Sequence, residues 1–209
     1  MSFTVNQPAL SAPPPKILKP RIPKVTVMVD IESCGPVPPR FSMLSLGAVV
    51  VDDAVGTPDE KNFYVEFQPI LGAEWDSYTT RIHGFTYDAS RRNGKSPGLA
   101  MVEFEEFLKT LNGKPEFFAD TGGFDWGFVN FYFWNYLARN PFGHTARDAR
   151  AYWIGVAAAA GDKRTFADLR PKGMHNHNAL DDARSNAIAL KQAWAIAEAH
   201  KQAHLTKKT

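Results

Sequence analysis

The chain has 209 residues, of which 44% are hydrophobic and 22% charged, as expected for a globular protein of one domain with a sizeable core. No apolar stretch reaches the ~18 residues that a membrane span requires. The single cysteine, Cys34, excludes an internal disulfide framework. These features predict a cytoplasmic protein with no membrane partner.

The formal net charge is +2 at pH 7, but the bases are unevenly distributed. Residues 1–24 contain four bases, no acid and six of the 15 prolines, and they show no hydrophobic periodicity. This composition predicts a disordered, proline-rich basic tail. An organellar transit peptide is the alternative, although the prolines argue against its amphipathic helix. The remainder has 20 bases against 22 acids, so nucleic acid would bind in a local cleft and not on a broad basic face.

A folded domain is expected over residues 25–200, followed by a frayed basic C-terminus over residues 201–209. In the first half of this domain, apolar runs typical of buried strands are separated by short segments of turn-forming residues. The predicted strands lie at 25–31, 43–51 and 62–67. Short connections between successive strands predict an antiparallel meander.

The second half of the domain changes to helical periodicity. Apolar residues recur at helical spacing from Met101 to Leu111, and a short strand is predicted at 116–119. Further helices are predicted at 124–137, within 145–160 and from Leu180 to Ala197. Strands first, then alternating helices and strands, predict an α/β fold with helices flanking one central mixed sheet.

Acidic side chains end the first strand. Asp30 and Glu32 are separated by one residue, so both point to the same side of the strand. Two carboxylates at a poorly solvated strand end repel each other, and a divalent cation would resolve that conflict. The alternative is an exposed strand end whose acids simply face water.

Another acid, Asp125, lies where a strand-like segment gives way to a helix. Gly122 and Gly123 precede it and permit a tight turn that would aim its side chain into a cleft. An acid in the first helical turn also has a structural role, because it stabilises the helix N-terminus by ~0.3–1 kcal/mol. Both interpretations remain open on this segment alone.

The segment before the last helix combines imidazole and carboxylate groups. Asn178 suits the N-cap of that helix, and Asp181 fits the position of a capping-box acid, which leaves Asp182 free to bind metal. His175 competes with His177 for the role of a general base. The two histidines also suggest zinc, or a solvent-exposed turn, but no cysteine pair or further histidine at ligand spacing supports zinc.

Together these motifs resemble those of the DEDDh exonucleases of the DnaQ-like superfamily, in the branch that includes RNase T, oligoribonuclease and polymerase proofreading subunits. The motifs are Asp30-Ile31-Glu32, Gly123-Phe124-Asp125 and His177-Asn178-Ala179-Leu180-Asp181-Asp182. His83-Gly84-Phe85-Thr86 is also similar to a His-Gly-Ile-Thr stretch of many members. The resemblance spans residue 25 to about 195 and implies an RNase H-like exonuclease fold with 3′–5′ exonuclease activity.

The chain departs from the family pattern at two places. Gly122 and Gly123 stand where many members have an asparagine before the second-motif aspartate. The first motif continues as Ser33-Cys34-Gly35 and then a proline-rich loop, where members often have Thr-Thr-Gly or Thr-Gly. These departures bear on substrate preference more than on activity, because all five chemical residues are present.

The resemblance implies that Asp30, Glu32, Asp125 and Asp182 hold two Mg²⁺ or Mn²⁺ ions and that His177 is the general base. Oxygen ligands suit these hard cations. The unperturbed pKa of ~6.5 of an imidazole suits proton transfer near neutral pH. The resemblance also implies that Glu32 contacts the terminal 3′-hydroxyl, which would direct attack to an end.

Further substrate contacts are expected outside these motifs. Phe41, Met43 and Phe124 are candidates for stacking on terminal bases, because stacking tolerates any base. Arg91 and Arg92 lie in a basic segment that is predicted as a loop, where they would either hold a phosphate or form a solvated turn. The expected partner is the 3′ end of single-stranded nucleic acid, with RNA favoured over DNA because RNA trimming is common among stand-alone relatives. A homodimer is a further expectation, since several relatives act as dimers.

Three alternatives accompany this interpretation. The first is a hydrolase of nucleotides or small phosphoesters on the same fold, which the dependence of hydrolysis on substrate length would distinguish. The second is a non-catalytic nucleic-acid-binding module, which would have little reason to retain all five residues. The third is an unrelated α/β protein with surface acids, and the joint occurrence of the motifs argues against it.

Overall fold

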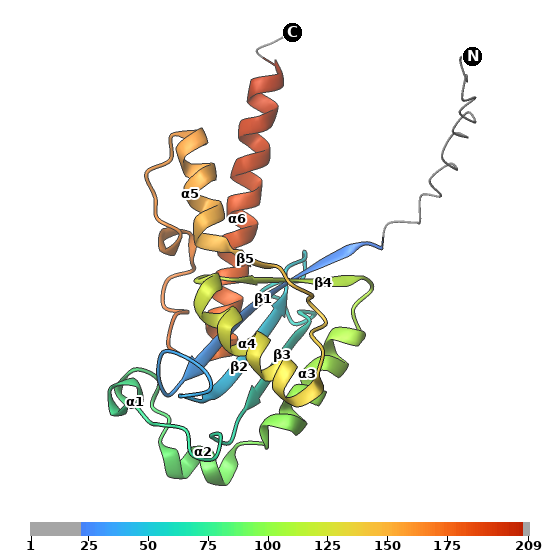
Figure 1. The fold of residues 1–209 in the computed structure, drawn as a ribbon. Helices are drawn as coiled ribbons and strands as arrows, with labels where there is room; N and C mark the ends of the chain where they lie inside the picture. Colours follow the sequence, from blue (N-terminus) through green and yellow to red (C-terminus); the bar gives the residue numbers. More distant parts are fainter. Residues whose placement is uncertain (1–21, 207–209) are drawn as a thin grey trace, which may run out of the picture.

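The computed structural model describes residues 22–206, so most of the expected proline-rich tail lies outside the described residues (Figure 1). Its centre is a five-stranded sheet with the strand order β3-β2-β1-β4-β5. The strands are β1 (Lys24–Ser33), β2 (Met43–Val50), β3 (Asn62–Glu66), β4 (Lys114–Ala119) and β5 (Ala146–Asp148). The helices are α1 (Ser77–His83), α2 (Tyr87–Asn93), α3 (Pro97–Lys109), α4 (Gly122–Leu137), α5 (Ala149–Ala160), the 3₁₀ turn η1 (Ala167–Leu169) and α6 (Ala179–Thr206).

The sheet is mixed, as predicted. Strands β1, β2 and β3 form an antiparallel meander, whereas β4 pairs with β1 in parallel and β5 pairs with β4 in parallel. Strand β1 is central, and Val27, Met28 and Val29 have no exposed surface, so both of its faces are covered. The carboxyl ends of the neighbouring parallel strands β1 and β4 meet at one edge of the sheet, where α/β proteins commonly place their sites.

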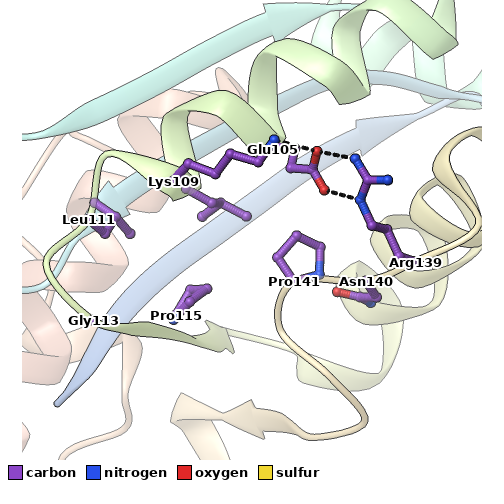
Figure 2. Close-up of a pocket in the computed structure, with 9 residues that line it drawn as sticks. Glu105, Lys109, Leu111, Gly113, Pro115, Arg139, Asn140 and Pro141 are labelled. Carbon is purple, nitrogen blue, oxygen red and sulfur yellow. Dashed lines mark hydrogen bonds and ion pairs between the residues drawn. The ribbon is translucent and has the colours of Figure 1, made fainter. Parts of the chain in front are cut away.

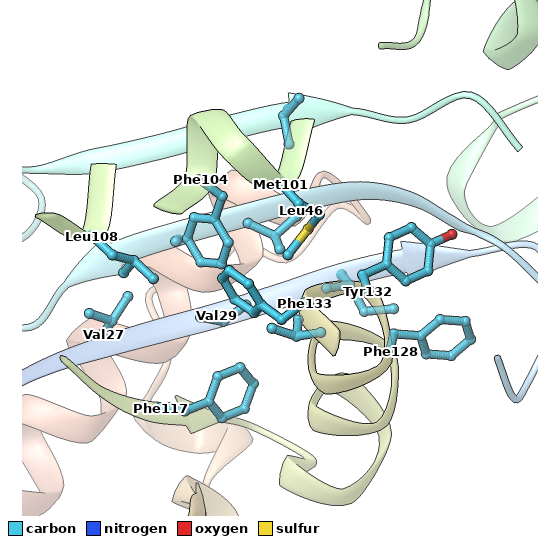
Figure 3. Close-up of a cluster of buried hydrophobic side chains, with 14 of the residues drawn as sticks. Val27, Val29, Leu46, Met101, Phe104, Leu108, Phe117, Phe128, Tyr132 and Phe133 are labelled. Atoms are coloured by element: carbon cyan, nitrogen blue, oxygen red, sulfur yellow. The ribbon is translucent and has the colours of Figure 1, made fainter. Parts of the chain in front are cut away.

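Helices cover both faces of the sheet. On one face, α3 and α4 pack an aromatic core in which Phe104, Phe117, Phe128 and Phe133 contact the aliphatic side chains of β1 and β2 (Figure 3). On the other face, α5 and α6 pack mainly through alanines around Trp153. The small side chains let α6 lie close to the sheet, which brings its N-terminal end to the acidic end of β1.

Several boundaries differ from the sequence-based expectations. Helix α6 continues to Thr206, so much of the segment that was expected to be frayed is helical. Arg91 and Arg92 lie in the last turn of α2, and the prediction of a basic loop there was wrong. Helix α1 was also not predicted, since it contains no buried residue and therefore shows no apolar periodicity. In the part of the chain that the structure describes, no helix is long and apolar enough to cross a membrane.

Candidate active site

Three elements bring carboxylates together at the carboxyl end of β1. Asp30 and Glu32 extend from β1, Asp125 from the first turn of α4, and Asp182 from the first turn of α6. Oxygen atoms of Asp30, Glu32 and Asp182 lie within 4.8 Å of one another. Side chains that are up to 152 positions apart in sequence therefore form one acidic cluster. The fourth expected carboxylate, Asp125, is close enough for its charge to act on Asp30 and Glu32.

Asp125 joins this cluster through the backbone of β1. The N–H of Ile31 donates a hydrogen bond to Oδ1 of Asp125 at 3.1 Å, and Asp125 is only 4% exposed. Gly122 begins α4 and donates its N–H to Oδ2 of Asp148, the last residue of β5. The start of α4 is thus fixed between β1 and β5, which determines where the Asp125 carboxylate points.

A glycine on β2 makes room for the fourth carboxylate. Gly47 pairs with Asp30 across the β1–β2 ladder. A Cβ atom at Gly47 would lie 2.3 Å from backbone atoms of Ala179 and Leu180, so a larger residue would displace the start of α6. Gly47 carries no signal in the sequence, because its role depends on a backbone contact with a helix 132 positions away.

Burial and neighbouring charges disfavour the charged forms of Asp30, Glu32 and Asp125. The pKa of Glu32 is raised to about 8, first by burial and then by the charges of Asp182 and Asp125. The pKa of Asp125 is also raised to about 8, mainly by burial, although the Ile31 hydrogen bond opposes the shift. Burial and the neighbouring acids raise the pKa of Asp30 well above its ordinary range. A divalent cation would stabilise the charged forms of these carboxylates, and oxygen donors suit Mg²⁺ or Mn²⁺.

The histidine-bearing turn lies next to this cluster. His177 has a left-handed backbone with φ of 60°, and its Nδ1 lies 3.9 Å from Oε1 of Glu32. Asn176 supports the turn by donating its backbone N–H to Oδ1 of Asp182 at 3.0 Å and by accepting the N–H of Asn178 at 3.0 Å. The turn therefore places the ring of His177 at the rim of the acidic cluster, with the side chain 42% exposed.

The helix cap at this turn differs partly from the prediction. Asn178 is the N-cap of α6, since its side-chain oxygen accepts the backbone N–H groups of Leu180 and Asp181. The Asp181 carboxylate does not complete a capping box. It accepts hydrogen bonds from the Asn176 side chain and from Arg184, whose guanidinium also binds the buried carboxylate of Glu60.

A groove continues from the acidic cluster towards α1. Glu32, Phe124 and His83 contribute to its lining, together with Ser33, Gly35, Pro36, Asp76, Thr79 and Ile82. Its volume is about 310 Å³, within the ~300–1,000 Å³ that is usual for small-ligand sites. His83 lies between the carbonyl of Ser33, 3.1 Å from its Nε2, and the N–H of Phe85, which donates to its Nδ1 at 3.1 Å. These bonds fix α1 against the end of β1 beside the groove.

The residues that were expected to contact the substrate do not lie together in the structure. Phe124 is 38% exposed and lines the groove, and its stacking role stays a prediction. Met43 has no exposed surface and belongs to the aromatic core, so the expectation that it stacks on a base was wrong. The ring of Phe41 packs against Gly35, where a Cβ atom would lie 2.1 Å from that ring. Arg91 and Arg92 are exposed on α2, and their role in phosphate binding stays a prediction.

A second hollow lies away from these residues, between the end of α3 and the loop that follows α4 (Figure 2). Glu105 is its only acid, and Arg139 holds that carboxylate with two hydrogen bonds of 2.6 Å. Lys109 lies 3.0 Å from the same carboxylate. These two cations hold the pKa of Glu105 down to about 2, so this charge is already satisfied within the protein. The hollow contains none of the five motif residues.

The fold and the acidic cluster point to a nuclease, and the comparisons with known proteins support that class. A family model, RNase_T, described as Exonuclease, matches residues 27–190. The 3′-5′ DNA exonuclease Cap18 of Escherichia coli is 30% identical over 185 residues, which cover 85% of this chain and 96% of Cap18. The chain therefore belongs to the exonuclease family, and the resemblance to DEDDh exonucleases is confirmed.

Solved structures agree with this assignment at the level of the fold. Cell-death related nuclease 4 (CRN-4) superposes with a TM-score of 0.64 at 14% identity, over 82% of this chain and 64% of that one. The chain thus spans slightly less than two thirds of the length of CRN-4. The nuclease domain of 3′hExo, a DEDDh family member solved with bound rAMP, has a TM-score of 0.59 at 16% identity, over 82% of this chain and 92% of that one. The expected RNase H-like exonuclease fold is confirmed.

Proposed function

We propose that this protein is a metal-dependent 3′–5′ exonuclease that removes nucleotides from the ends of single-stranded nucleic acid. The observation that carries the proposal is the acidic cluster, in which buried carboxylates with raised pKa values converge from β1, α4 and α6. Asp30, Glu32, Asp125 and Asp182 would hold two Mg²⁺ or Mn²⁺ ions. When bound, such ions lower the pKa of a water and stabilise the charge on the leaving oxygen.

His177 is proposed as the general base that takes the proton from the attacking water. Its ring is adjacent to Glu32 and partly exposed, so it can both reach a water at the cluster and pass the proton to solvent. The left-handed backbone at His177 and the hydrogen bonds of Asn176 hold the turn that carries this ring. A positioned base of this kind contributes roughly 10²–10⁴-fold to a rate.

The groove beside Glu32 is proposed to receive the terminal nucleotide. Phe124 would stack on the base, and Glu32, which also lines the groove, would accept a hydrogen bond from the 3′-hydroxyl, as the family resemblance implies. A hydroxyl at this point identifies the chain end, so the enzyme would act from the 3′ end and not within a strand.

We propose DNA as the preferred substrate. The sequence alone favoured RNA, but the relative that is 30% identical over most of the chain carries the activity of a DNA exonuclease. Discrimination would depend on whether the groove accommodates and binds a 2′-hydroxyl. Self-association and a cytoplasmic location stay predictions, and the first can be tested by measuring the mass of the protein in solution.

Incubation of the purified protein with 5′-labelled single-stranded DNA and RNA of matched sequence tests the proposal. Reactions would contain Mg²⁺, Mn²⁺ or EDTA, with Asp125→Asn as the inactive variant. Asp181→Asn is the matched control, because Asp181 neighbours the cluster and pairs with Arg184 instead. The expected result is a metal-dependent ladder that shortens from the 3′ end, absent only in Asp125→Asn. Cleavage of nucleotides or small phosphoesters alone would contradict the proposal, as would binding without cleavage.

A further inference from the structure

A second imidazole stands at the acidic cluster, and the proposed mechanism leaves it unused. His175 precedes His177 by two residues, and the centres of the two rings are 5.0 Å apart. The Nδ1 of His175 lies 3.0 Å from Oδ1 of Asp182, whose own surface is almost completely buried. His175 is thus turned towards the cluster although its side chain is 47% exposed.

His175, His177 and Asp182 each offer one ligand atom, and these atoms all lie within 4.8 Å of one another. Two imidazole nitrogens and a carboxylate oxygen form the donor set of several catalytic zinc sites, which keep the fourth position open. The neighbouring group of Asp30, Glu32 and Asp182 consists of oxygen donors only. We propose that His175, His177 and Asp182 form a second site, which shares Asp182 with the oxygen-only group and binds a borderline transition metal ion, principally Zn²⁺.

The local backbone suits such a site. Donor atoms around a tetrahedral zinc ion are about 3.3 Å apart, given bond lengths of ~2.0–2.1 Å. Both imidazoles are partly exposed, so they can rotate to close the remaining gap. The left-handed turn at His177 and the bond from the Asn176 N–H to Asp182 hold both histidines on the same side of the turn.

Occupation of this site would interfere with catalysis, an inference that rests on the proposed function. Asp182 is shared with the oxygen-only group, and His177 is the proposed base. A zinc ion would engage the His177 lone pair and an oxygen of Asp182, so it would remove both from the reaction. Mg²⁺ prefers oxygen ligands, and it would compete poorly for the two imidazoles. Zinc is therefore expected to inhibit the magnesium-supported enzyme.

The binding test needs a background without the other histidine pair. His200 and His204 on α6 are one turn apart, with ring centres 4.5 Å from each other, and they would also attract zinc. The experiment therefore starts from a parent variant in which His200 and His204 are both replaced by alanine. Zn²⁺ is then titrated by calorimetry in excess Mg²⁺, and Co²⁺ is used as a substitute whose visible absorption reports four-coordinate nitrogen and oxygen ligation.

Two substitutions at His175 separate ligation from packing. His175→Ala removes the imidazole, whereas His175→Asn retains an amide near the position of Nδ1 that can still donate to Asp182. Both should weaken zinc binding by at least about tenfold, since even outer partners of metal ligands contribute roughly 10–100-fold. Both should also abolish the intense Co²⁺ absorption. Unchanged zinc affinity and an unchanged Co²⁺ spectrum in the two variants would overturn the site.

Activity provides a second and separate readout. The zinc concentration that halves the Mg²⁺-supported nuclease rate should increase in both His175 variants, when each is compared with its own zinc-free rate. Zinc inhibition that is identical in parent and variants would overturn the inhibitory role. A different outcome is that the parent protein shows no nuclease activity but the His175 variants still lose zinc binding. That result would contradict the proposed function and would support the metal site.

Discussion

The backbone N–H of Ile31 donates a hydrogen bond to Oδ1 of Asp125, and this bond of 3.1 Å connects the first and second acidic motifs. Ile31 lies between Asp30 and Glu32, so the contact sets the distance between α4 and the acidic end of β1. The bond also partly offsets the rise that burial causes in the pKa of Asp125, because a hydrogen bond to the charged form stabilises that form.

Asp125→Asn should separate the charge of this residue from its structural bond. An amide oxygen can still accept the Ile31 N–H, so the variant should fold and its Tm without metal should not decrease. Its affinity for Mn²⁺ and its turnover should both fall, because a charged oxygen ligand is lost. Calorimetric titration of Mn²⁺ measures the first effect, and an affinity equal to that of the wild type would disprove the ligand role of Asp125.

Removal of metal should make stability depend on pH in an unusual direction. The pKa values of Glu32 and Asp125 are about 8 in the folded protein, well above their ordinary values. A raised carboxyl pKa means that the folded state binds protons more tightly, so stability decreases as the pH rises from ~4 through 8. In EDTA, the Tm at pH 6 should therefore exceed that at pH 8.5 by at least about 2–4 °C, the shift produced by ~1 kcal/mol in a domain of this size.

Two controls accompany the thermal measurement. Glu32→Gln removes one of the repelling charges and should reduce the difference in Tm between the two pH values. Saturating Mg²⁺ should raise the Tm at pH 8.5 more than at pH 6, because the cation binds the ionised carboxylates. A metal-free protein that is more stable at pH 8.5 than at pH 6 would refute this account of the cluster.

His177 should be tested with a substitution that preserves the backbone. Alanine disfavours the left-handed conformation that has φ of 60°, whereas asparagine adopts it more readily and lacks a basic nitrogen. His177→Asn should therefore keep Mn²⁺ affinity while turnover decreases roughly 10²–10⁴-fold. Single-turnover kinetics with saturating metal measure the decrease. Full turnover in this variant would assign the base elsewhere, and His175 would be the next residue to replace.

The sequence predicted the clustering of the acidic residues better than the helices around them. Asp30, Glu32 and Asp182 lie at a strand end and a helix start, which local patterns and the family resemblance identify. Helices α1 and α2 were missed because they bury almost no side chains and so lack the apolar periodicity of a core helix. Met43 was misplaced for a related reason: a strand buried on both faces has no alternation that would distinguish exposed from buried positions.

Phe124 should contribute to substrate affinity and not to the chemical step. Its ring lines the groove and contacts Phe128 edge-on, with ring centres 5.4 Å apart. Phe124→Ala should weaken binding of a single-stranded oligonucleotide by about 1–3 kcal/mol, the contribution of one stacked base. Trp134→Ala is the matched control, because Trp134 is also an exposed aromatic residue of α4 but does not line the groove. Fluorescence anisotropy in Ca²⁺ or EDTA measures both, and equal losses would contradict a specific stacking role.

Gly47→Ala should damage the site from a position that bears no reactive group. The added Cβ would lie 2.3 Å from the backbone of Ala179 and Leu180, where no flexible side chain can yield. The start of α6 must therefore move away from β2, and overpacking of this kind costs typically ~1–3 kcal/mol. Because Asp182 and the His177 turn are attached to that end of α6, Mn²⁺ affinity and turnover should decrease as well as Tm.

A second glycine provides the control for Gly47. Gly155 is exposed on α5, and a Cβ atom there would meet nothing within 4 Å. Gly155→Ala should stabilise the protein by up to about 1 kcal/mol, because alanine has the higher helix propensity, and activity should not change. If Gly47→Ala retained full turnover and Mn²⁺ affinity after loss of stability, the position of α6 would not control the site, and the four carboxylates would tolerate a wider arrangement.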